Sequence, residues 1–373
     1  MLIYLILIFS IYFGFLLICI TGWQKYMRQP KRPVLEKKEF VSVAVAVRNE
    51  ENSISPLLSS LMVQDFPHSN FELIFVNDHS TDHTACIISD WIKDNPQTQC
   101  YHIHSTGNGK KQALTDGIKI AKGEIILTTD GDCVLPNDWI SSMVMSFNDE
   151  TTLVIGLVKI QQEGSLFSKL QALEFSSLMG SGISLLELGF PIMCNGASLA
   201  FRKKSFEAVK GYQDNLHIPS GDDEFLMRKL MKQFPNSIQS NYWPTVVVAT
   251  KSQPSLKSFI HQRLRWAGKW SVNDSLIPKV LALFILIFQL TSMVAFGLLF
   301  SGKNLVGVGI LLSLKFLLEG YFLFHVGRTL HQRFSVSAFL ILQLIYPFYV
   351  LIIGILSQLV DYEWKGRRKP SIG

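Results

Sequence analysis

The stretch EIILTTDGDCVLPNDWI, residues 124–140, is the most informative part of this sequence. A buried strand from Glu124 to Thr129 would deliver Asp130 and Asp132 to the carboxyl edge of a sheet, where open α/β sheets bind ligands. Gly131 lets the backbone turn so that both carboxylates face one cation. Such oxygen ligands suit Mg²⁺ or Mn²⁺, ions that also hold phosphate oxygens. The alternative interpretation is an Asp-rich turn with a helix N-cap.

Strands alternate with helices on the amino-terminal side of this stretch. We expect strands at 40–47 and 71–76, separated by a helix that ends near Leu61. A third unit runs from a strand near Tyr101 into a helix at about 112–121, and the strand before Asp130 is the fourth. This alternation predicts an α/β fold with a mostly parallel, doubly wound, Rossmann-like sheet.

Polar side chains follow each expected strand, at the edge where this topology places a ligand. They are Asn49 and Glu50, Asp78 and Asp82, Lys110, and Asp130 and Asp132. Asp78 is suited to accept hydrogen bonds from a base or ribose, whereas Asp82 in Ser-Thr-Asp is suited to cap a helix. Lys110 is either a solvated charge or a nucleotide contact, because Lys111 after it departs from the Walker pattern.

Two further stretches carry candidate chemistry downstream. Asp222-Asp223-Glu224 opens an amphipathic helix and is either a favourable set of helix-start charges or the source of a general base. Like-charge repulsion and partial burial beside a bound diphosphate would raise the pKa of such an acid. The region 161–202, with its Gly-containing turn at 194–198, is expected between the metal site and the base, close to an acceptor, or is a simple connector.

The stretch Gln262-Arg263-Leu264-Arg265-Trp266 lies within 255–270, just before an apolar segment. Gln262, Arg265 and Trp266 share one helix face because they are three and four residues apart. An interfacial amphipathic helix with basic headgroup contacts is the alternative, and one helix can serve both purposes on two faces.

Apolar residues make up 48% of the 373, and the excess lies at the two ends of the chain. Leu2–Ile20 is long enough to be a transmembrane anchor, and the apolar segments 277–300, 305–326 and 335–360 follow near the carboxyl end. The basic cluster after the first segment places residues 40–270 in the cytoplasm by the positive-inside rule. Its members are Lys25, Arg28, Lys31, Arg32, Lys37 and Lys38.

The number of times that the last three apolar segments cross the membrane decides on which side the carboxyl-terminal tail lies. Three full crossings would place the tail outside, although it carries Lys365, Arg367, Arg368 and Lys369. The middle segment contains Lys315 and Glu319, which lipid tolerates only if the two groups pair or face protein or water. This segment therefore either spans the membrane or is re-entrant or interfacial. A polar site inside the membrane is a further alternative.

Charge and cysteine content exclude other classes. The net charge of +6 is explained by the two basic clusters, which suit anionic membrane lipids, and no basic-aromatic nucleic-acid motif is present. The five cysteines form no CxxC pair, as expected for a reduced cytosolic domain without structural zinc.

Six ordered motifs together resemble glycosyltransferase family 2, in particular the membrane-anchored cellulose-synthase-like and poly-N-acetylglucosamine-synthase-like enzymes. They are VAVAVRNEE, NDHSTD, GKKQALTDG, TTDGDC, SGDDEFL and QRLRW, and they cover about 230 residues. NDHSTD resembles the family's DDGSxD, with Asn77 and His79 as departures, and QRLRW matches QxxRW. SGDDEFL stands where such enzymes have TED or GED, which leaves the base between Asp223, favoured, and Asp222.

The resemblance implies an inverting transferase with a GT-A domain, which moves a sugar from a nucleotide-diphospho-sugar, preferably a UDP-sugar. It implies donor contacts, metal ligands, a base and an acceptor contact at matching positions. Those are Glu50, Asp78, Lys110, Asp130, Gln262 and Arg265 for the donor, Asp132 and Asp130 for Mg²⁺ or Mn²⁺, Asp223 or Asp222 for the base, and Trp266 for acceptor sugar.

The implied acceptor is a lipid or a growing polysaccharide. Because the membrane part is short, a lipid acceptor or a membrane partner subunit is favoured over a self-made channel. A catalytically silent sugar-nucleotide sensor or scaffold is the alternative. We expect a transmembrane anchor (1–23), a basic linker (24–39), a cytosolic GT-A domain (40–254), an interfacial helix (255–275), two or three spanning segments (276–360) and a basic tail (361–373) of a plasma- or inner-membrane protein.

Overall fold

The computed structural model describes residues 1–29, 39–216, 218, 220–268 and 276–360, with the backbone of 362–364 and 367–369. Lys31, Arg32, Lys37 and Lys38 of the linker, and the side chains of the basic tail, lie outside the described residues. The chain forms two compact units. The sheet unit contains residues 26–161 and 189–251, and the membrane-helix unit contains 1–25, 162–188 and 252–373.

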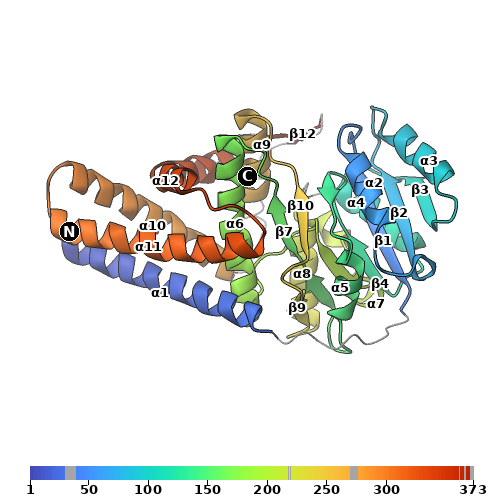
Figure 1. Ribbon diagram of the computed structural model, residues 1–373, viewed down its shortest axis with the longest axis horizontal. Helices are drawn as coiled ribbons and strands as arrows, with labels where there is room; N and C mark the ends of the chain where they lie inside the picture. Colours follow the sequence, from blue (N-terminus) through green and yellow to red (C-terminus); the bar gives the residue numbers. More distant parts are fainter. Residues whose placement is uncertain are drawn as a thin grey trace. The chain divides into compact units, whose positions relative to one another are not determined.

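The sheet unit is built on seven strands in the order β3-β2-β1-β4-β8-β6-β9 (Figure 1). Parallel pairing joins β1 to β2 and β4, β2 to β3, and β6 to β9. The mostly parallel α/β sheet is therefore confirmed, with β8 antiparallel to both of its neighbours. The strands are β1 Val41–Val47, β2 Phe71–Asn77, β3 Cys100–His104, β4 Ile125–Thr128, β6 Leu153–Ile155, β8 Leu199–Arg202 and β9 Ile238–Ser240.

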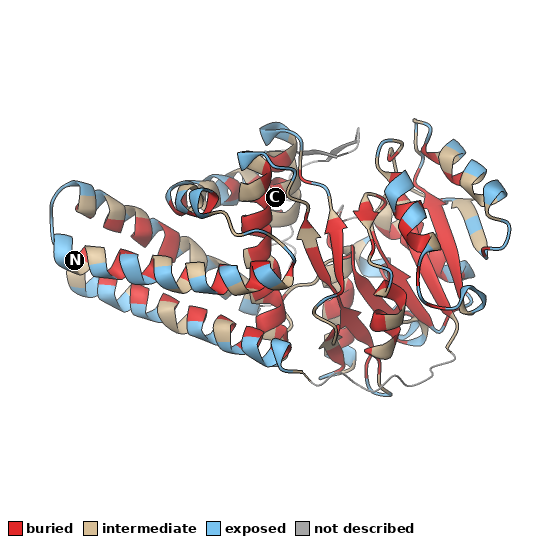
Figure 2. Ribbon diagram, in the orientation of Figure 1, coloured by how far each residue is buried: buried red, intermediate tan, exposed pale blue. Residues whose placement is uncertain are grey.

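Helices of the sheet unit alternate with these strands, as the sequence predicts. Residues of β2 and β4 are buried throughout, and Figure 2 shows the central strands as buried along their length. Strands buried on both faces are nearly continuous apolar runs, which is why β1 is rich in Val and Ala and β2 in Phe and aliphatic residues. The helices are α2 Ile54–Met62, α3 Thr84–Asp94, α4 Lys110–Ile120, α5 Trp139–Met145, α7 Lys203–Ala208 and α8 Asp222–Gln233.

A second, three-stranded sheet has the order β5-β10-β7. Its strands are β5 Cys133–Val134, β7 Leu157–Ile160 and β10 Val247–Thr250. Thr250 pairs with Cys133 across the antiparallel β10–β5 ladder. This pairing sets the end of β10 directly beside the Asp130–Asp132 turn.

The membrane-helix unit contains four helices that are long and apolar enough to cross a membrane. They are α1 Leu2–Met27, α10 Leu276–Phe300, α11 Leu305–Thr329 and α12 Val336–Leu359, accompanied by α6 Leu166–Glu187, α9 Leu256–Ala267 and the hairpin of β11 Tyr362–Trp364 with β12 Arg367–Lys369. α1, α10 and α11 lie side by side around one apolar cluster that includes Phe9, Phe288 and Leu312 (Figure 1). α6, which lies within the expected 40–254 domain, groups with this unit.

Lys315 and Glu319 of α11 are paired, as the sequence requires. Lys315 Nζ lies 3.1 Å from Glu319 Oε2, and both residues are buried. Gln343 Nε2 donates to the same oxygen at 2.6 Å, and Tyr12 Oη donates to Glu319 Oε1 at 2.6 Å. α11 is one continuous helix of 25 residues. Its crossing of the bilayer stays a prediction.

Candidate active site

Asp78 lies at the end of β2 and is 2% exposed. Its Oδ1 accepts a hydrogen bond from the backbone N–H of Gly109, 3.0 Å away, so it fixes the loop that leads into α4. Arg48 donates to the carbonyl oxygens of Asp78 and His79, both at 2.7 Å. The ends of β1 and β2 are thus joined through their polar residues to the start of α4.

Asp82 is bound at the start of α3, in agreement with a helix-start role. Its Oδ1 accepts from the backbone N–H and the hydroxyl of Thr84, at 3.1 and 2.6 Å. Burial acts to raise the pKa of Asp82, but hydrogen bonds from Thr84 and from the backbone of Glu51 outweigh it and lower the pKa. The hydrogen-bond partners of Asp82 are thus neighbouring backbone and hydroxyl groups of the protein.

His79 occupies the position at which it departs from the family's glycine, and its φ is 54°. This left-handed region favours glycine, although His enters it more readily than most residues. Its Nε2 lies 3.1 Å from the carbonyl oxygen of Gly107. The side chain therefore makes a contact to the loop before α4 that glycine would lack.

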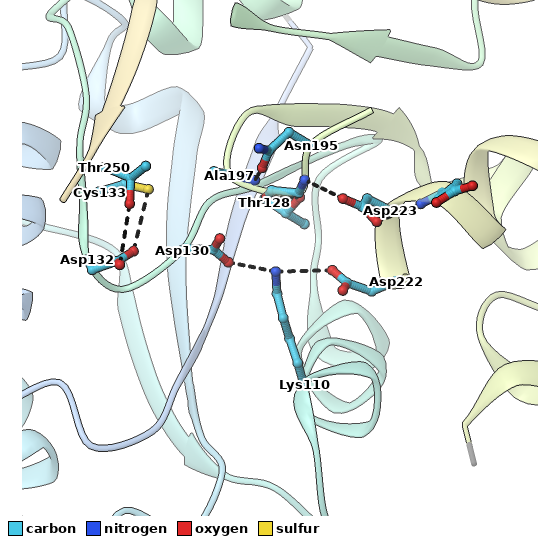
Figure 3. Close-up of polar contacts among 12 residues, drawn as sticks. Lys110, Thr128, Asp130, Asp132, Cys133, Asn195, Ala197, Asp222, Asp223 and Thr250 are labelled. Carbon is cyan, nitrogen blue, oxygen red and sulfur yellow. Dashed lines mark hydrogen bonds and ion pairs between the residues drawn. The ribbon is translucent and has the colours of Figure 1, made fainter. Parts of the chain in front are cut away.

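Lys110, at the first position of α4, bridges two acids from distant parts of the chain (Figure 3). Its Nζ lies 2.6 Å from Asp130 Oδ1 and 3.1 Å from Asp222 Oδ2. Burial acts to lower the pKa of Lys110, but Asp130 and Asp222 outweigh it, and the pKa stands well above its ordinary value. Lys110 is therefore a largely buried ionic contact rather than a solvated charge, and its contact with a nucleotide stays a prediction.

Asp222 and Asp223 have different partners although they are adjacent. Asp223 Oδ2 accepts from the backbone N–H of Gly196 at 3.0 Å, and its Oδ1 accepts from Glu224 N at 2.7 Å (Figure 3). A Cβ added to Gly196 would lie 3.1 Å from both Lys110 Nζ and Asp222 Oδ2. The turn at 194–198 thus lies against both acids. In the sequence, the Asn195-Gly196 pair is the feature that indicates a turn here.

Asp132 lies beside β10, because Thr250 Oγ1 donates to its Oδ2 at 3.3 Å. Sequence reasoning missed Thr250, whose only signal is its place at the end of a short β-rich run. A Cβ added to Gly131 would lie 3.0 Å from Glu50 Cγ, so Glu50 packs against the same turn. Glu50, Asp78, Lys110, Asp130, Asp132, Asp222 and Asp223 all belong to the sheet unit.

A protein-family comparison matches residues 42–210 to the family described as Glycosyl transferase family 2. These residues belong to glycosyl transferase family 2. The family 2 domain so defined contains Glu50, Asp78, Lys110 and the Asp130–Asp132 turn, while Asp222 and Asp223 lie just beyond it.

Curated relatives agree with this domain. The chain is 28% identical over 263 residues to a poly-β-1,6-N-acetyl-D-glucosamine synthase of Staphylococcus epidermidis, a match that covers 68% of the chain and 61% of the relative. A synthase of the same name from Staphylococcus aureus is 27% identical over 261 residues, covering 69% and 60%. The chain thus matches about three-fifths of the length of these relatives.

A solved structure shares the fold over nearly the whole chain. It is the mannosyltransferase PcManGT from Pyrobaculum calidifontis in complex with GDP-Man and Mn²⁺. The TM-score is 0.55 at 16% identity, and the match covers 96% of this chain and 99% of that one. The family 2 domain is therefore a GT-A domain in a chain with transmembrane helices.

The carboxylates of the family 2 domain fit a divalent ion. Asp130 and Asp132 flank Gly131, and the described residues contain no group of three His, Cys, Asp or Glu that could hold a metal by themselves. Mg²⁺ is ordinarily bound by one or two carboxylates, with substrate phosphates and water completing its octahedron. Asp130 and Asp132 could supply such a two-carboxylate donor set, and metal binding by them stays a prediction.

The QRLRW stretch lies on α9 in the membrane-helix unit. Gln262, Arg265 and Trp266 are therefore placed on one helix, as predicted, and their proximity to the acids of the sheet unit stays a prediction. The guanidinium carbon of Arg263, a residue for which the sequence predicts no role, lies 4.2 Å from the centroid of the Trp266 ring.

Proposed function

We propose that this chain is a membrane-bound inverting glycosyltransferase. It transfers a sugar from a nucleotide-diphospho-sugar to a hydroxyl group of a lipid or growing polysaccharide. The observation that carries the proposal is the Lys110 bridge, in which one ammonium group contacts Asp130 of the family 2 domain and Asp222 just beyond that domain. A transferase needs donor-side and acceptor-side acids close together, because the leaving diphosphate and the attacking hydroxyl meet at one anomeric carbon.

The donor side is assigned to the strand ends. Glu50, Asp78 and Lys110 contact the nucleotide part, and Asp130 contacts ribose or diphosphate. Asp78 is buried against the loop before α4, which supports a rigid wall for a base or ribose. UDP-N-acetylglucosamine is our proposed donor, since the curated relatives are named as synthases of an N-acetylglucosamine polymer.

Asp132 and Asp130 would hold Mg²⁺ or Mn²⁺. The ion would supply electrostatic stabilisation for the diphosphate as negative charge develops on it, often the largest contribution to such catalysis. Thr250 orients Asp132 by its hydrogen bond. Arg265 and Gln262 of α9 are assigned to the leaving diphosphate, and Trp266 to acceptor sugar.

Asp223 is assigned as the base, with Asp222 as the alternative. The acceptor oxygen attacks the anomeric carbon as its proton passes to an Asp223 oxygen. The bond between that carbon and the diphosphate oxygen breaks, and the nucleoside diphosphate leaves with the electron pair. The Gly196 and Glu224 N–H groups hold the Asp223 carboxylate in place, which supports its role as a positioned base.

We further propose that the sheet unit faces the cytoplasm, where nucleotide sugars are made. The basic residues that follow the first apolar segment support this orientation. A membrane partner subunit would complete an export path if the product is a polymer.

The test is a donor screen with the full chain purified in detergent with Mn²⁺. Released nucleoside diphosphate and the mass of any product lipid or glycan are measured for each donor, beside Asp132→Ala. The proposal is supported if the unaltered protein transfers sugar from one donor and the Asp132→Ala protein does not. Binding without any transfer, over all donors and acceptors, would instead identify a silent sensor. Products of many lengths would indicate a growing polysaccharide, and one defined mass a single transfer.

A further inference from the structure

Arg263 and Glu174 form a buried ion pair in the membrane-helix unit, which joins α9 to α6. Arg263 Nη2 lies 2.5 Å from Glu174 Oε2, and Arg263 Nε donates to Glu174 Oε1 at 3.2 Å. The two side chains are only 3% and 5% exposed. A two-point contact between a guanidinium and a carboxylate fixes the plane of the guanidinium as well as its position.

A third side chain donates a further hydrogen bond to the Glu174 carboxylate. Tyr349 of α12 donates from its hydroxyl to Glu174 Oε1 at 3.1 Å. Burial of two charges is costly unless their remaining hydrogen-bonding groups are also satisfied, so the added donor from α12 stabilises the carboxylate. Burial acts to lower the pKa of Arg263, but Glu174 outweighs it and raises the pKa, so the guanidinium stays charged.

The fixed guanidinium contacts two residues of the QRLRW stretch. Arg263 Nη1 donates to Gln262 Oε1 at 2.5 Å. The guanidinium carbon lies 4.2 Å from the centroid of the Trp266 ring and 4.4 Å from that of Phe259. A cation over an aromatic face orients that face, and a hydrogen bond to an amide oxygen orients the amide. Gln262 and Trp266 are therefore held by one rigid plane.

We propose that the Glu174–Arg263 pair is a positioning device for Gln262 and Trp266. The pair holds the Gln262 amide in the orientation that binds the diphosphate and the Trp266 indole in the orientation that contacts the acceptor sugar. The catalytic side of this inference rests on the function proposed above, whereas the orientation of the two side chains does not. Arg263 and Glu174 act through their neighbours and are positioning residues.

The membrane-helix unit offers a matched control. Lys315 and Glu319 form a second buried ion pair, also supported by a tyrosine hydroxyl and a further hydrogen bond, on helices other than α9. The double variant Glu174→Gln/Arg263→Met and the double variant Lys315→Met/Glu319→Gln each remove one buried pair without leaving a lone charge. Loss of general stability should affect both.

The experiment uses the full chain in detergent, labelled with 5-fluorotryptophan. ¹⁹F NMR resolves the signals of the seven tryptophans, and Trp266→Phe assigns that of Trp266. We expect the Trp266 signal to shift in the Glu174→Gln/Arg263→Met protein and to stay in place in the Lys315→Met/Glu319→Gln protein. We also expect kcat to fall by about 10- to 100-fold only in the first, because small misplacements of catalytic groups cost about this much. The KM for the donor should change little, since its main contacts lie elsewhere.

A Trp266 signal that stays in place in the first variant would overturn the inference, whatever happens to kcat. Equal losses of kcat in both variants, or equal shifts of the signal, would overturn it as well, because they indicate packing alone. If the unaltered protein transfers no sugar, the proposed function fails, while the ¹⁹F signal still decides whether the pair orients Trp266.

Discussion

Lys110 Nζ lies 2.6 Å from Asp130 Oδ1, so the acid that opens the Asp-Gly-Asp turn already has a cationic partner from the neighbouring helix. The ammonium also contacts Asp222, which follows Asp130 far along the chain. Without this charge the two carboxylates would repel each other. The bridge therefore explains how the acids can be gathered in one place before a ligand arrives.

Replacement of Lys110 by Gln should weaken donor binding by about 10- to 100-fold, because a hydrogen bond to a charged group contributes about 1.5–3 kcal/mol. Mn²⁺ alone should bind more tightly to this variant, since the competing cation is gone. Isothermal titration with UDP-sugar and with Mn²⁺ measures both effects. Lys119→Gln, at an exposed position of the same helix, is the control. Unchanged affinities for both ligands would contradict the assigned role.

The exchange of Asp223 for Asn should lower kcat by about 10²- to 10⁴-fold and leave the Kd of the donor nearly unchanged, as expected for a general base. Asp222→Asn should instead weaken the Lys110 bridge and affect donor binding first. Steady-state rates and donor titrations on both variants separate these effects. The reverse pattern would transfer the base to Asp222.

Asp116 anchors the loop before Lys110. Its carboxylate accepts from Thr106 N at 2.7 Å and from Gln112 Nε2 at 2.8 Å. Burial acts to raise the pKa of Asp116, but these hydrogen bonds outweigh it and lower the pKa below 3.8. A lowered pKa means that the stabilisation is present above pH 3.8 and is lost as the pH falls through the folded-state value.

Asp116→Asn should therefore lower the free energy of unfolding by about 0.5–1.5 kcal/mol at pH 7, because the site is only partly buried and hydrogen bonds to a neutral amide are weaker than those to a carboxylate. The difference from the unaltered protein should shrink below pH 3.8. Denaturant titration at several pH values measures it, with the exposed Asp90→Asn as the comparison. A difference that is constant down to the lowest pH would exclude the carboxylate as its source.

At position 79, Gly should be better tolerated than Ala. Both substitutions remove the contact with Gly107, but only Ala keeps a side chain at a φ of 54°, which costs about 1–2 kcal/mol. His79→Gly should accordingly unfold at a higher temperature than His79→Ala. The same Tm for both would indicate that the backbone relaxes away from this conformation.

The sequence predicts the parallel strands well because their apolar runs end in turn residues, as at Asn77 and Asp130. It does not predict the antiparallel β8, since a strand of four residues after a long helix carries no signal of its direction. Lys110 has an ordinary helix-start context, and only the fold brings Asp222 to it. Likewise, nothing in the sequence around Glu174 indicates its ion pair with Arg263, which forms only when α6 packs against α9. Local patterns specify elements, whereas partners far apart in the chain depend on packing.

Tyr12 donates to Glu319, a partner 307 residues later in the chain. At a synthesis rate of about 5–20 residues per second, the first helix waits roughly 15 to 60 s before that partner leaves the ribosome. Until then the Tyr12 hydroxyl cannot make this hydrogen bond. This contact of the bundle therefore forms late in biosynthesis, and an mRNA truncated before the codon for Glu319 would yield a first helix that keeps Phe288 beside the Tyr12 ring but lacks the acceptor of its hydroxyl.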